Sequence, residues 1–519
     1  MNVSFAEDMR RIDETVTRDY GLPAAALMEN AGRRTAEEAA QLIGGAQGRV
    51  FAVFAGGGNN GGDAFAAARH LMNMGARVKL FFTGAADRLG EAARAMHDAV
   101  RAMGVEIRPL ESDRDWDRLR VSLRFADAVV DGILGTGVQG ELRKPILRLI
   151  EEINGAGKPT IAIDIPSGVE ANTGRIVSLA VRADRTLALG LPKVGHFLGA
   201  GANTAGALLV DDIGIPQALL AGDQLRQSLI TRDAAAKLLP ARARDAHKGT
   251  CGRILVLAGS LGMTGAAALA AEAALRIGAG LVTLAVPERI YPVLAAKMTE
   301  VMVVPIPDEG NGCFGGMQAL QEAAALAAYA DAVLIGPGIG RAPETGEFVR
   351  LFAAEVKAPL VMDADAVHAF RGHLDALRDL PQVPILTPHV GEFAGLLGRE
   401  NSTVQDNLLH TAREAARSHQ AVFVVKSACT IVVYPDGDAF FTTCGNAGMA
   451  TAGAGDVLAG AIVGLMRQME SGMTPLVGVY MHGRAGDLAY ERSGNGLMAG
   501  DILAELPQAL KELGEAQLR

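Results

Sequence analysis

Two glycine-rich loops in this sequence could bind phosphate groups. The first is Gly56-Gly57-Gly58-Asn59-Asn60-Gly61-Gly62-Asp63, which follows an apolar segment and precedes a helical one. Glycine lets backbone N–H groups come close to a phosphate, and the N-terminus of a helix adds partial positive charge. A tight strand-to-helix turn is the simpler interpretation. The two asparagines and the aspartate add contacts that a plain dinucleotide-binding loop lacks, so a binding loop is favoured.

The second loop is Gly453-Ala454-Gly455-Asp456, and it precedes the apolar helical segment 457–466. Backbone donors at a helix start, with a carboxylate beside them, form the pattern of an anion-binding site. An aspartate in that position can take the proton from a hydroxyl group that attacks a terminal phosphoryl group. The alternative interpretation is an ordinary helix cap.

Other polar residues come directly after apolar segments. In the first half these are Asp131 and Asp164, which together could hold a cation or act as a base, although each alone is more often a helix cap. In the second half they include His389 and Lys426. Singly, these would be a packed or surface histidine and an exposed lysine, but a lysine there could neutralise phosphate charge. Because the carboxyl ends of parallel strands meet at one edge of a sheet, we expect these residues to join the glycine loops.

Short apolar segments alternate with helical patterns in both halves, which predicts an α/β fold with mostly parallel sheets covered on both faces. An amphipathic helical segment at 5–43 comes first. The strands expected in the first half are 49–55, 77–82, 127–131, 160–164 and 185–189. Those expected in the second half are 253–258, 281–286, 331–335, 359–363, 383–386 and 421–426, followed by a hairpin of 430–434 and 439–442. A polar, helix-prone stretch after residue 216 separates the two series, and a helix-rich tail begins at residue 453.

The 519 residues carry 49 basic and 58 acidic side chains, a net charge of −9, and suit two domains, which we place at 1–225 and 226–519. The acidic balance and the aromatic content of only 4% argue against nucleic-acid binding. The four cysteines are far apart, the N-terminus lacks a signal-peptide pattern, and glycines interrupt the charge-free stretch 254–271. We therefore expect a cytoplasmic protein without a membrane segment. Apolar helical segments such as 266–277 suit a homo-oligomer, which we also expect.

These loops, in this order, resemble those of the bifunctional NAD(P)H-hydrate repair enzymes. That family joins an NAD(P)HX epimerase domain to an ADP-dependent NAD(P)HX dehydratase domain, and the resemblance covers essentially the whole chain. Besides the first glycine loop, it rests on Asp131 with segment 135–141, on Gly259-Ser260 with segment 264–266, and on segments 164–168, 191–196, 247–250, 336–340, 363–366, 387–389 and 451–460, the last of which contains the second glycine loop. It implies a Rossmann-like, three-layer αβα first domain with a mostly parallel sheet, and a ribokinase-like α/β second domain.

For the first domain, the resemblance implies interconversion of the R and S forms of the hydrates NADHX and NADPHX. Asp164 would be the catalytic base. The potassium ligands would be Asn60, Asp131 and Ser167. The substrate-binding residues would be Asn59, Asn60, Gly61, Gly62, Asp63, Gly135, Thr136, Gly137, Val138, Gln139, Gly140, Glu141 and Asp164.

For the second domain, it implies dehydration of S-NAD(P)HX to NAD(P)H at the expense of ADP, which yields AMP and phosphate. Asp456 would be the catalytic base, and Mg²⁺ would bridge the phosphates. The hydrate would contact Ala266, Gly338, His389 and Asp456. The nucleotide would contact Lys426, Ser427, Ala428, Cys429, Thr430 and Gly455.

Ala64 and Ser427 depart from the family pattern, which has glycine at both positions. Alanine is well tolerated in a helix, so Ala64 should cost little. If the position of Ser427 required a positive φ, serine would add strain on the order of 1 kcal/mol or more. The departure at Ser427 therefore bears on nucleotide binding.

Two other functions are open on the sequence. The loop Gly453–Asp456 alone would suit a ribokinase-like small-molecule kinase fused to a nucleotide-binding or interaction domain. The first domain could also be a non-enzymatic scaffold. The segment Thr387-Pro388-His389 and the presence of Asp131, Asp164 and the Asn59–Asp63 loop favour the repair enzyme.

Overall fold

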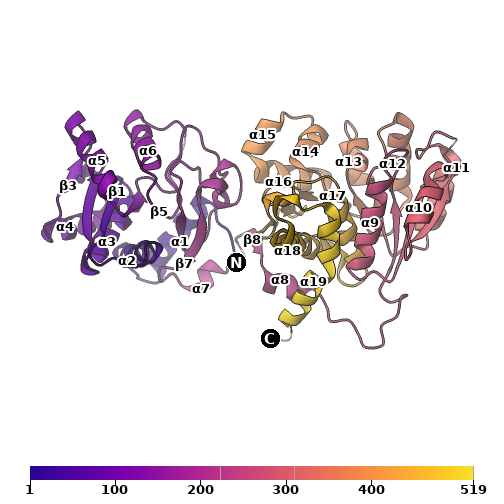
Figure 1. Ribbon diagram of the computed structural model, residues 1–519, viewed down its shortest axis with the longest axis horizontal. Coiled ribbons are helices and arrows are strands. Elements are labelled where there is room, and N and C mark those ends of the chain that lie inside the picture. The colour runs from indigo at the N-terminus through magenta and orange to yellow at the C-terminus, as the bar shows by residue number, and fades with distance from the viewer. Residues whose placement is uncertain (139, 223, 309, 518–519) are drawn as a thin grey trace. The chain divides into compact units, whose positions relative to one another are not determined.

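Figure 1 shows a computed structural model of the chain, which describes residues 1–138, 140–222, 224–308 and 310–517. The chain forms two compact units, Asn2–Arg226 and Gln227–Arg519, the second of which includes Met1. Each unit is built on one sheet, and helices lie between most successive strands. The predicted α/β class is confirmed for both units.

The first unit has seven parallel strands in the order β3-β2-β1-β4-β5-β6-β7. They are β1 (Val50–Ala55), β2 (Arg77–Phe82), β3 (Ile107–Pro109), β4 (Ala128–Gly132), β5 (Thr160–Ile163), β6 (Arg185–Leu189) and β7 (Ala207–Asp211). The predictions omitted β3 and β7, the two edge strands. β3 has only three residues with Arg108 at its centre, and β7 is not fully buried at any position, so neither has the apolar run of a central strand.

Helices cover both faces of this sheet. They are α1 (Ala6–Asp19), α2 (Ala24–Leu42), α3 (Asn59–Asn73), α4 (Glu91–Ala102), α5 (Asp113–Phe125), α6 (Lys144–Ala156) and α7 (Gln217–Leu220). Apolar side chains of α1 to α4 pack on one face, and those of α5 and α6 pack on the other, which confirms the three-layer arrangement. The predicted N-terminal helical segment is two helices, because Gly21 has a left-handed φ of 68° and Pro23 precedes α2.

The second unit has ten strands in the order β11-β10-β9-β12-β13-β14-β15-β16-β17-β8. They are β8 (Gln227–Ile230), β9 (Arg253–Leu257), β10 (Leu281–Pro287), β11 (Met302–Ile306), β12 (Ala332–Ile335), β13 (Leu360–Met362), β14 (Ile385–Leu386), β15 (Val422–Val425), β16 (Ile431–Val433) and β17 (Ala439–Thr442). The predicted hairpin is the antiparallel pair β16 and β17. The edge strand β11 was not predicted. The stretch predicted to be helix-prone contains β8, so that prediction is wrong there: its residues pair with β17 at the other edge of the sheet.

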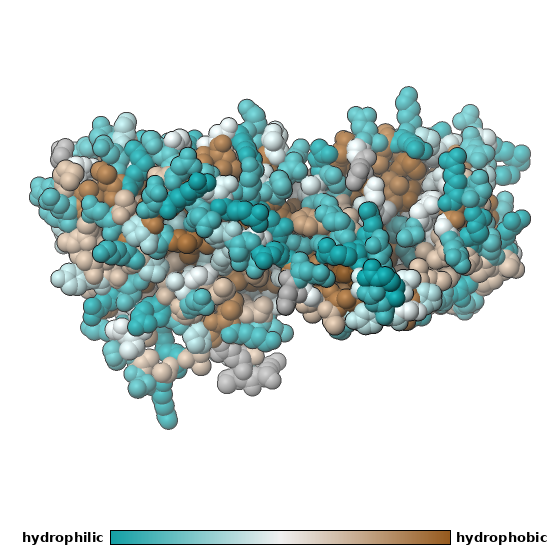
Figure 2. All heavy atoms as spheres, turned by 180° about the vertical axis from the view of Figure 1, so that it is seen from behind, coloured by the Kyte–Doolittle hydropathy of each residue, from teal (hydrophilic) through white to brown (hydrophobic). Residues whose placement is uncertain are grey.

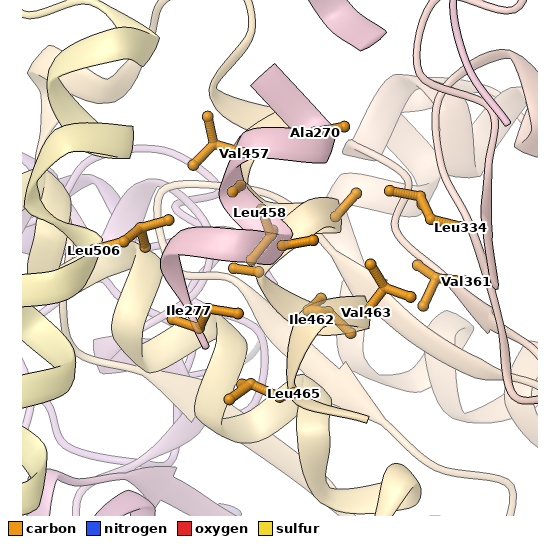
Figure 3. Packing of buried hydrophobic residues seen from close by; sticks show 14 of the residues in the cluster. Ala270, Ile277, Leu334, Val361, Val457, Leu458, Ile462, Val463, Leu465 and Leu506 are labelled. Carbon is orange, nitrogen blue, oxygen red and sulfur yellow. The ribbon is translucent and has the colours of Figure 1, made fainter. Parts of the chain in front are cut away.

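The helices of the second unit are α8 (Arg232–Leu238), α9 (Thr264–Arg276), α10 (Tyr291–Lys297), α11 (Gly316–Ala327), α12 (Pro343–Glu355), α13 (Asp365–Ala369), α14 (Val390–Leu397), α15 (Asn401–Asp406), α16 (Leu408–His419), α17 (Ala454–Leu465), α18 (Thr474–Ser493) and α19 (Ala499–Gln517). Figure 3 shows the core, where α9 crosses α17 beside the strands that carry Leu334 and Val361. A Cβ at Gly460 of α17 would lie 2.2 Å from the Ala270 carbonyl oxygen, so this close helix contact requires glycine. The contact fixes the helix whose first turn carries Asp456.

The charge-free stretch 254–271 is β9, a loop and the start of α9, as predicted. In the part of the chain that the structure describes, no helix is long and apolar enough to span a membrane. On the face seen in Figure 2, hydrophilic side chains cover most of the surface, and hydrophobic ones form smaller patches between them.

Candidate functional sites

The first glycine loop connects the end of β1 to the start of α3, as predicted. Two of its glycines, Gly61 and Gly62, lie in close packing. A Cβ at Gly61 would lie 1.8 Å from the Gly56 carbonyl oxygen, and one at Gly62 would lie 2.5 Å from the Met28 side chain. The methyl group of Ala64 is fully buried and faces Gly132, where a Cβ would lie 2.6 Å from it. The departure at Ala64 is therefore accommodated by a glycine on β4.

The loops at the carboxyl edge of the first sheet surround a cavity of about 500 Å³. Eight of the predicted substrate-binding residues line it: Asn59, Asn60, Asp63, Gly135, Thr136, Gly137, Val138 and Asp164. Gly140 and Glu141 are exposed outside this lining, and Gln139 lies outside the described residues. Three charged residues that were not predicted also line the cavity: Arg10, Asp13 and Lys193.

The structure brings together Asn60, Asp131 and Ser167 around the backbone of Leu134. Asn60 Nδ2 donates to the Leu134 carbonyl at 2.8 Å, and the Leu134 N–H donates to Ser167 Oγ at 2.9 Å. Ser167 Oγ donates to the fully buried Asp131 Oδ1 at 2.6 Å. Burial raises the pKa of Asp131 to about 6, against the effect of the Ser167 hydrogen bonds. Asn60 Oδ1 is buried without a hydrogen-bond partner, and such hard oxygen donors suit a hard cation.

Asp164 follows β5 in a left-handed conformation, with a φ of 64°, which is strained for a residue other than glycine. Its carboxylate forms an ion pair with Lys193 and accepts the Leu189 N–H at 3.1 Å. His196 Nδ1 accepts the Lys193 N–H at 2.9 Å, so its Nε2 carries the proton that it donates to the Asp164 carbonyl at 2.9 Å. Burial and the Lys193 charge lower the pKa of His196 to about 4, which keeps the ring neutral. These contacts fix both the backbone and the side chain of Asp164.

Three carboxyl groups of the cavity interact with the Lys193 ammonium: Asp13, Asp63 and Asp164. Asp13 is exposed at the cavity wall, but desolvation by the residues around it raises its pKa to about 6; Lys193 opposes the rise and the charge of Asp164 adds to it. Burial also raises the pKa of Asp63, which is 7% exposed, well above its ordinary value. The cavity can therefore supply protonated and ionised carboxyl groups near neutral pH, as acid–base chemistry requires.

In the second unit, Lys426 joins the ends of β13, β14 and β15. Its Nζ lies 2.9 Å from Oδ1 of Asp363, which is 1% exposed and also accepts the Thr387 hydroxyl at 2.6 Å. Burial lowers the pKa of Lys426, but the carboxylates of Asp363, Glu392 and Asp456 outweigh burial and raise it. Lys426 is therefore a cation at the carboxyl edge of the sheet.

The second glycine loop begins α17, as predicted. Gly453 has a left-handed φ of 90° and precedes the first helical residue. A Cβ at Gly455 would lie 3.1 Å from Lys426 Nζ, so the ammonium lies against the backbone of this turn. Burial raises the pKa of Asp456 to about 7, and Asp363 adds to the rise while Lys426 opposes it. A carboxylate that can accept a proton near neutral pH thus lies beside a cation and a helix N-terminus.

The predicted hydrate-binding positions Ala266 and Gly338 adjoin each other. A Cβ at Gly338 would lie 3.0 Å from the Ala266 Cβ, and Gly338 has a left-handed φ of 60°. Two residues after Gly338, the Gly340 N–H donates a hydrogen bond to the Asp365 carboxylate at 3.1 Å. Asp365 in turn contributes to the raised pKa of Asp456. The loop therefore belongs to the same site as the predicted base.

His389 precedes α14 and caps it. Its Nδ1 accepts the backbone N–H groups of Gly391 and Glu392 at 3.1 and 3.2 Å, and its backbone pairs with Lys426 in a parallel bridge. Because Nδ1 accepts, Nε2 carries the proton, and it lies 3.6 Å from Glu392 Oε1. The side chain is 59% exposed, so its donor can reach a ligand beside Lys426.

The predicted nucleotide-binding segment 426–430 is a bend that leads into β16. Ser427 is not among the non-glycine residues with a positive φ, so the strain considered from the sequence does not arise. Its Oγ donates to the Cys429 carbonyl at 2.6 Å. The Cys429 thiol is buried against the Thr442 carbonyl, and burial raises its pKa to about 12. This cysteine is a packed side chain rather than a reactive one.

Sequence reasoning gave no role to Asp13, Lys193 or Asp363. Asp13 lies four residues after the buried Met9 on α1, and an acidic residue beside an apolar helix face was the available signal. Lys193 stands in the apolar segment Leu191–Val194, where a charged residue is unexpected. Asp363 ends an apolar segment, but its hydrogen bond and its ion pair come from residues distant in sequence.

Comparison with known proteins gives two family matches. A model of the NAD(P)H-hydrate dehydratase family matches residues 254–508, and a model of the YjeF-related protein N-terminus matches residues 24–195. A solved structure described as an ADP/ATP-dependent NAD(P)H-hydrate dehydratase from Bacillus subtilis, co-crystallised with ATP and Mg²⁺, is 29% identical in sequence. It covers 55% of this chain and 98% of its own, with a TM-score of 0.48.

Full-length relatives carry both halves. A protein of Moorella thermoacetica named bifunctional NAD(P)H-hydrate repair enzyme Nnr is 40% identical over 513 residues, which are 98% of this chain and 97% of the relative. A protein of the same name from Thermofilum pendens is 37% identical over 521 residues, which are 99% of this chain and 97% of that relative. Neither the kinase nor the scaffold alternative is favoured by these full-length matches. The chain belongs to the family of bifunctional NAD(P)H-hydrate repair enzymes.

Proposed function

We propose that this chain restores hydrated NADH and NADPH, with epimerisation in the first unit and nucleotide-dependent dehydration in the second. The observation that carries the proposal is that Asp456 and the Lys426 ammonium both lie at the start of α17. A base with a pKa near 7 beside a fixed cation and a helix N-terminus suits the transfer of a phosphoryl group to a hydroxyl.

In the second unit, Asp456 takes the proton of the ring hydroxyl while the hydroxyl oxygen attacks the terminal phosphorus of ADP. The phosphorus–oxygen bond to AMP breaks, and AMP leaves. The electron pair of the ring nitrogen then expels phosphate from the neighbouring carbon. Loss of a proton from the adjacent ring carbon restores the double bond of NAD(P)H. Lys426 and the N–H of Gly455 stabilise the negative charge on the transferred group.

The nucleotide would lie along residues 426–430, and the hydrate would lie against Ala266, Gly338 and His389. Magnesium, held chiefly by phosphate oxygens and water, would neutralise charge during transfer. Such an ion needs few protein ligands. Among the described residues, no group of three or more His, Cys, Asp and Glu side chains is placed to hold a metal ion.

In the first unit, the hydrate would occupy the 500 Å³ cavity, where Asp164 acts as the base. Backbone N–H groups of the loops at Asn59 and Gly135 would bind its phosphates. Asn60 Oδ1, which is buried without a hydrogen-bond partner, would coordinate a bound potassium ion together with the oxygens of Asp131 and Ser167.

The proposal is tested by absorbance at the reduced-nicotinamide band, with a mixture of R and S NADHX, ADP, Mg²⁺ and K⁺. We expect a rise that consumes both epimers faster than they interconvert spontaneously. A rise that stops once the S epimer is spent would refute the epimerase assignment. No rise with either ADP or ATP would refute the dehydratase assignment.

A further inference from the structure

The cavity of the first unit contains a carboxyl group that the proposed reaction has not used. Asp13 lies in the middle of α1, and residues Met9, Asp13 and Thr17 of that helix all line the cavity. Their spacing of four residues places them in one stripe on the helix surface. Asp13 is therefore on the side of α1 that forms a cavity wall.

The position of α1 is fixed relative to Asp164 and Lys193. The Ser4 N–H donates to the Pro192 carbonyl at 2.9 Å, and Ser4 and Lys193 pair in a parallel bridge. The Ala6 N–H, at the first turn of α1, donates to Asn172 Oδ1 at 2.8 Å. Asp13 and Asp164 thus approach one cavity from two different elements, the helix α1 and the turn after β5.

Asp13 and Asp164 have different charged neighbours, and this difference is the basis for giving them different roles. Lys193, Asp164 and Glu14 act on Asp13 directly, and Asp63 is coupled to it across the cavity. Arg10 of the same helix also lines the cavity. Asp13 is exposed to solvent at the cavity wall, yet desolvation by the surrounding residues raises its pKa to about 6, so both of its protonation states are populated near neutral pH. Asp164, in contrast, forms an ion pair with the Lys193 ammonium.

We propose that Asp13 is a second catalytic residue of epimerisation and acts with Asp164 as an acid–base pair on the two faces of the hydrated ring. This inference rests on the proposed epimerase function. The hydroxyl of the hydrate is on the carbon beside the ring nitrogen, because water adds to that carbon of an enamine. The same nitrogen can expel the hydroxyl once an acid protonates it.

The steps balance without a further reactant. Protonated Asp13 gives its proton to the hydroxyl, the carbon–oxygen bond breaks, and water leaves as the nitrogen lone pair forms a planar C=N⁺ bond. A water on the opposite face attacks that carbon, the C=N π pair returns to nitrogen, and Asp164 takes the proton of the attacking water. For the other epimer the roles reverse, with Asp164 as the acid and Asp13 as the base. Exchange with solvent returns each carboxyl group to its starting state.

The test uses the full chain with one pure epimer of NADPHX, with ADP omitted so that the second unit cannot consume the hydrate. We expect Asp13→Asn to lower kcat for epimerisation by ~100-fold, with KM changed by less than about threefold. We expect the pH profile of kcat/KM to have a limb near pH 6 in the wild type and to lose it in Asp13→Asn. Epimerisation in H₂¹⁸O should place one ¹⁸O in the hydroxyl for each inversion.

Asp19→Asn is the matched control, because Asp19 is an exposed aspartate of the same helix that does not belong to the cavity lining; its kcat should stay within about twofold of the wild type. An Asp13→Asn enzyme with the wild-type kcat, or with an unchanged pH profile, would overturn the role of Asp13. Inversion without ¹⁸O would overturn the carbon–oxygen step. If the wild type itself failed to epimerise, the proposed function would fail instead, and the two failures are thus distinct.

Discussion

The Lys193 ammonium and the Asp164 carboxylate form an ion pair inside the first unit, where the lysine side chain is only 1% exposed and the aspartate side chain 15%. The Lys193 ammonium also donates to the Leu189 carbonyl at 2.9 Å, and the Leu189 N–H donates to the Asp164 carboxylate at 3.1 Å. A buried cation with these partners balances the negative charge of a cavity that also contains Asp13 and Asp63. The pair therefore concerns both stability and chemistry.

Replacing Lys193 with methionine should destabilise the first unit by about 3 kcal/mol at pH 7.5, because a buried carboxylate loses its partner. The loss should be smaller at pH 5. Without Lys193, the folded-state pKa values of Asp13 and Asp63 rise further above their unfolded-state values. The loss in free energy of unfolding therefore grows as the pH rises from the unfolded-state to the folded-state pKa values. Urea unfolding at the two pH values measures this. An equal loss at both would contradict the electrostatic role.

Asp164→Ala should stop epimerisation while leaving dehydration of pure S-NADPHX with ADP at the wild-type rate, because Asp164 and Asp456 belong to different units. Chromatography of the R and S forms without ADP measures the first activity, and absorbance measures the second. Interconversion at the wild-type rate would show that Asp164 is not the base.

Asp456→Asn should lower dehydration by at least ~100-fold, since an amide cannot accept the hydroxyl proton. In the wild type, kcat/KM for the hydrate should rise with pH and level off above about 7, where Asp456 is ionised. The exposed Glu355 of α12 offers a control, and Glu355→Gln should keep the full rate. Full turnover by Asp456→Asn would remove this residue from the mechanism.

Potassium should raise the Tm of the first unit in a concentration-dependent way, because a ligand that binds only the folded state stabilises it. Replacing Asn60 with alanine should abolish this dependence by removing the orphan Oδ1. Asn73→Ala, an exposed change at the other end of α3, should retain it. A K⁺ effect on Tm that survived in Asn60→Ala would place the ion elsewhere.

Ser427→Gly should leave the KM for ADP within about twofold of the wild type. Ser427 has no left-handed backbone, so glycine relieves no strain, and the change removes only the hydrogen bond to the Cys429 carbonyl, worth ~1 kcal/mol. Steady-state kinetics with varied ADP measures this. A tenfold lower KM in the variant would mean that serine itself obstructs the nucleotide.

The sequence determined the fold class, the central strands and the glycine loops. Strands buried on both faces need continuous apolar runs, and the turns after them need glycine or small polar residues. Each of these features can therefore be predicted from a short stretch of sequence. The edge strands β3, β7, β8 and β11 were not predicted, because an edge strand is partly exposed and its short or polar sequence resembles a loop.

Tertiary structure decided the electrostatics of both sites. The ion pair of Lys426 with Asp363 spans 63 positions of sequence, and that of Lys193 with Asp164 spans 29. Asp13 reaches the same cavity from an N-terminal helix. A pKa depends on burial and on charges within a few ångströms, and neither quantity is a property of a local segment. The types of the residues were therefore readable from the sequence, whereas their partnerships and protonation states followed only from the fold.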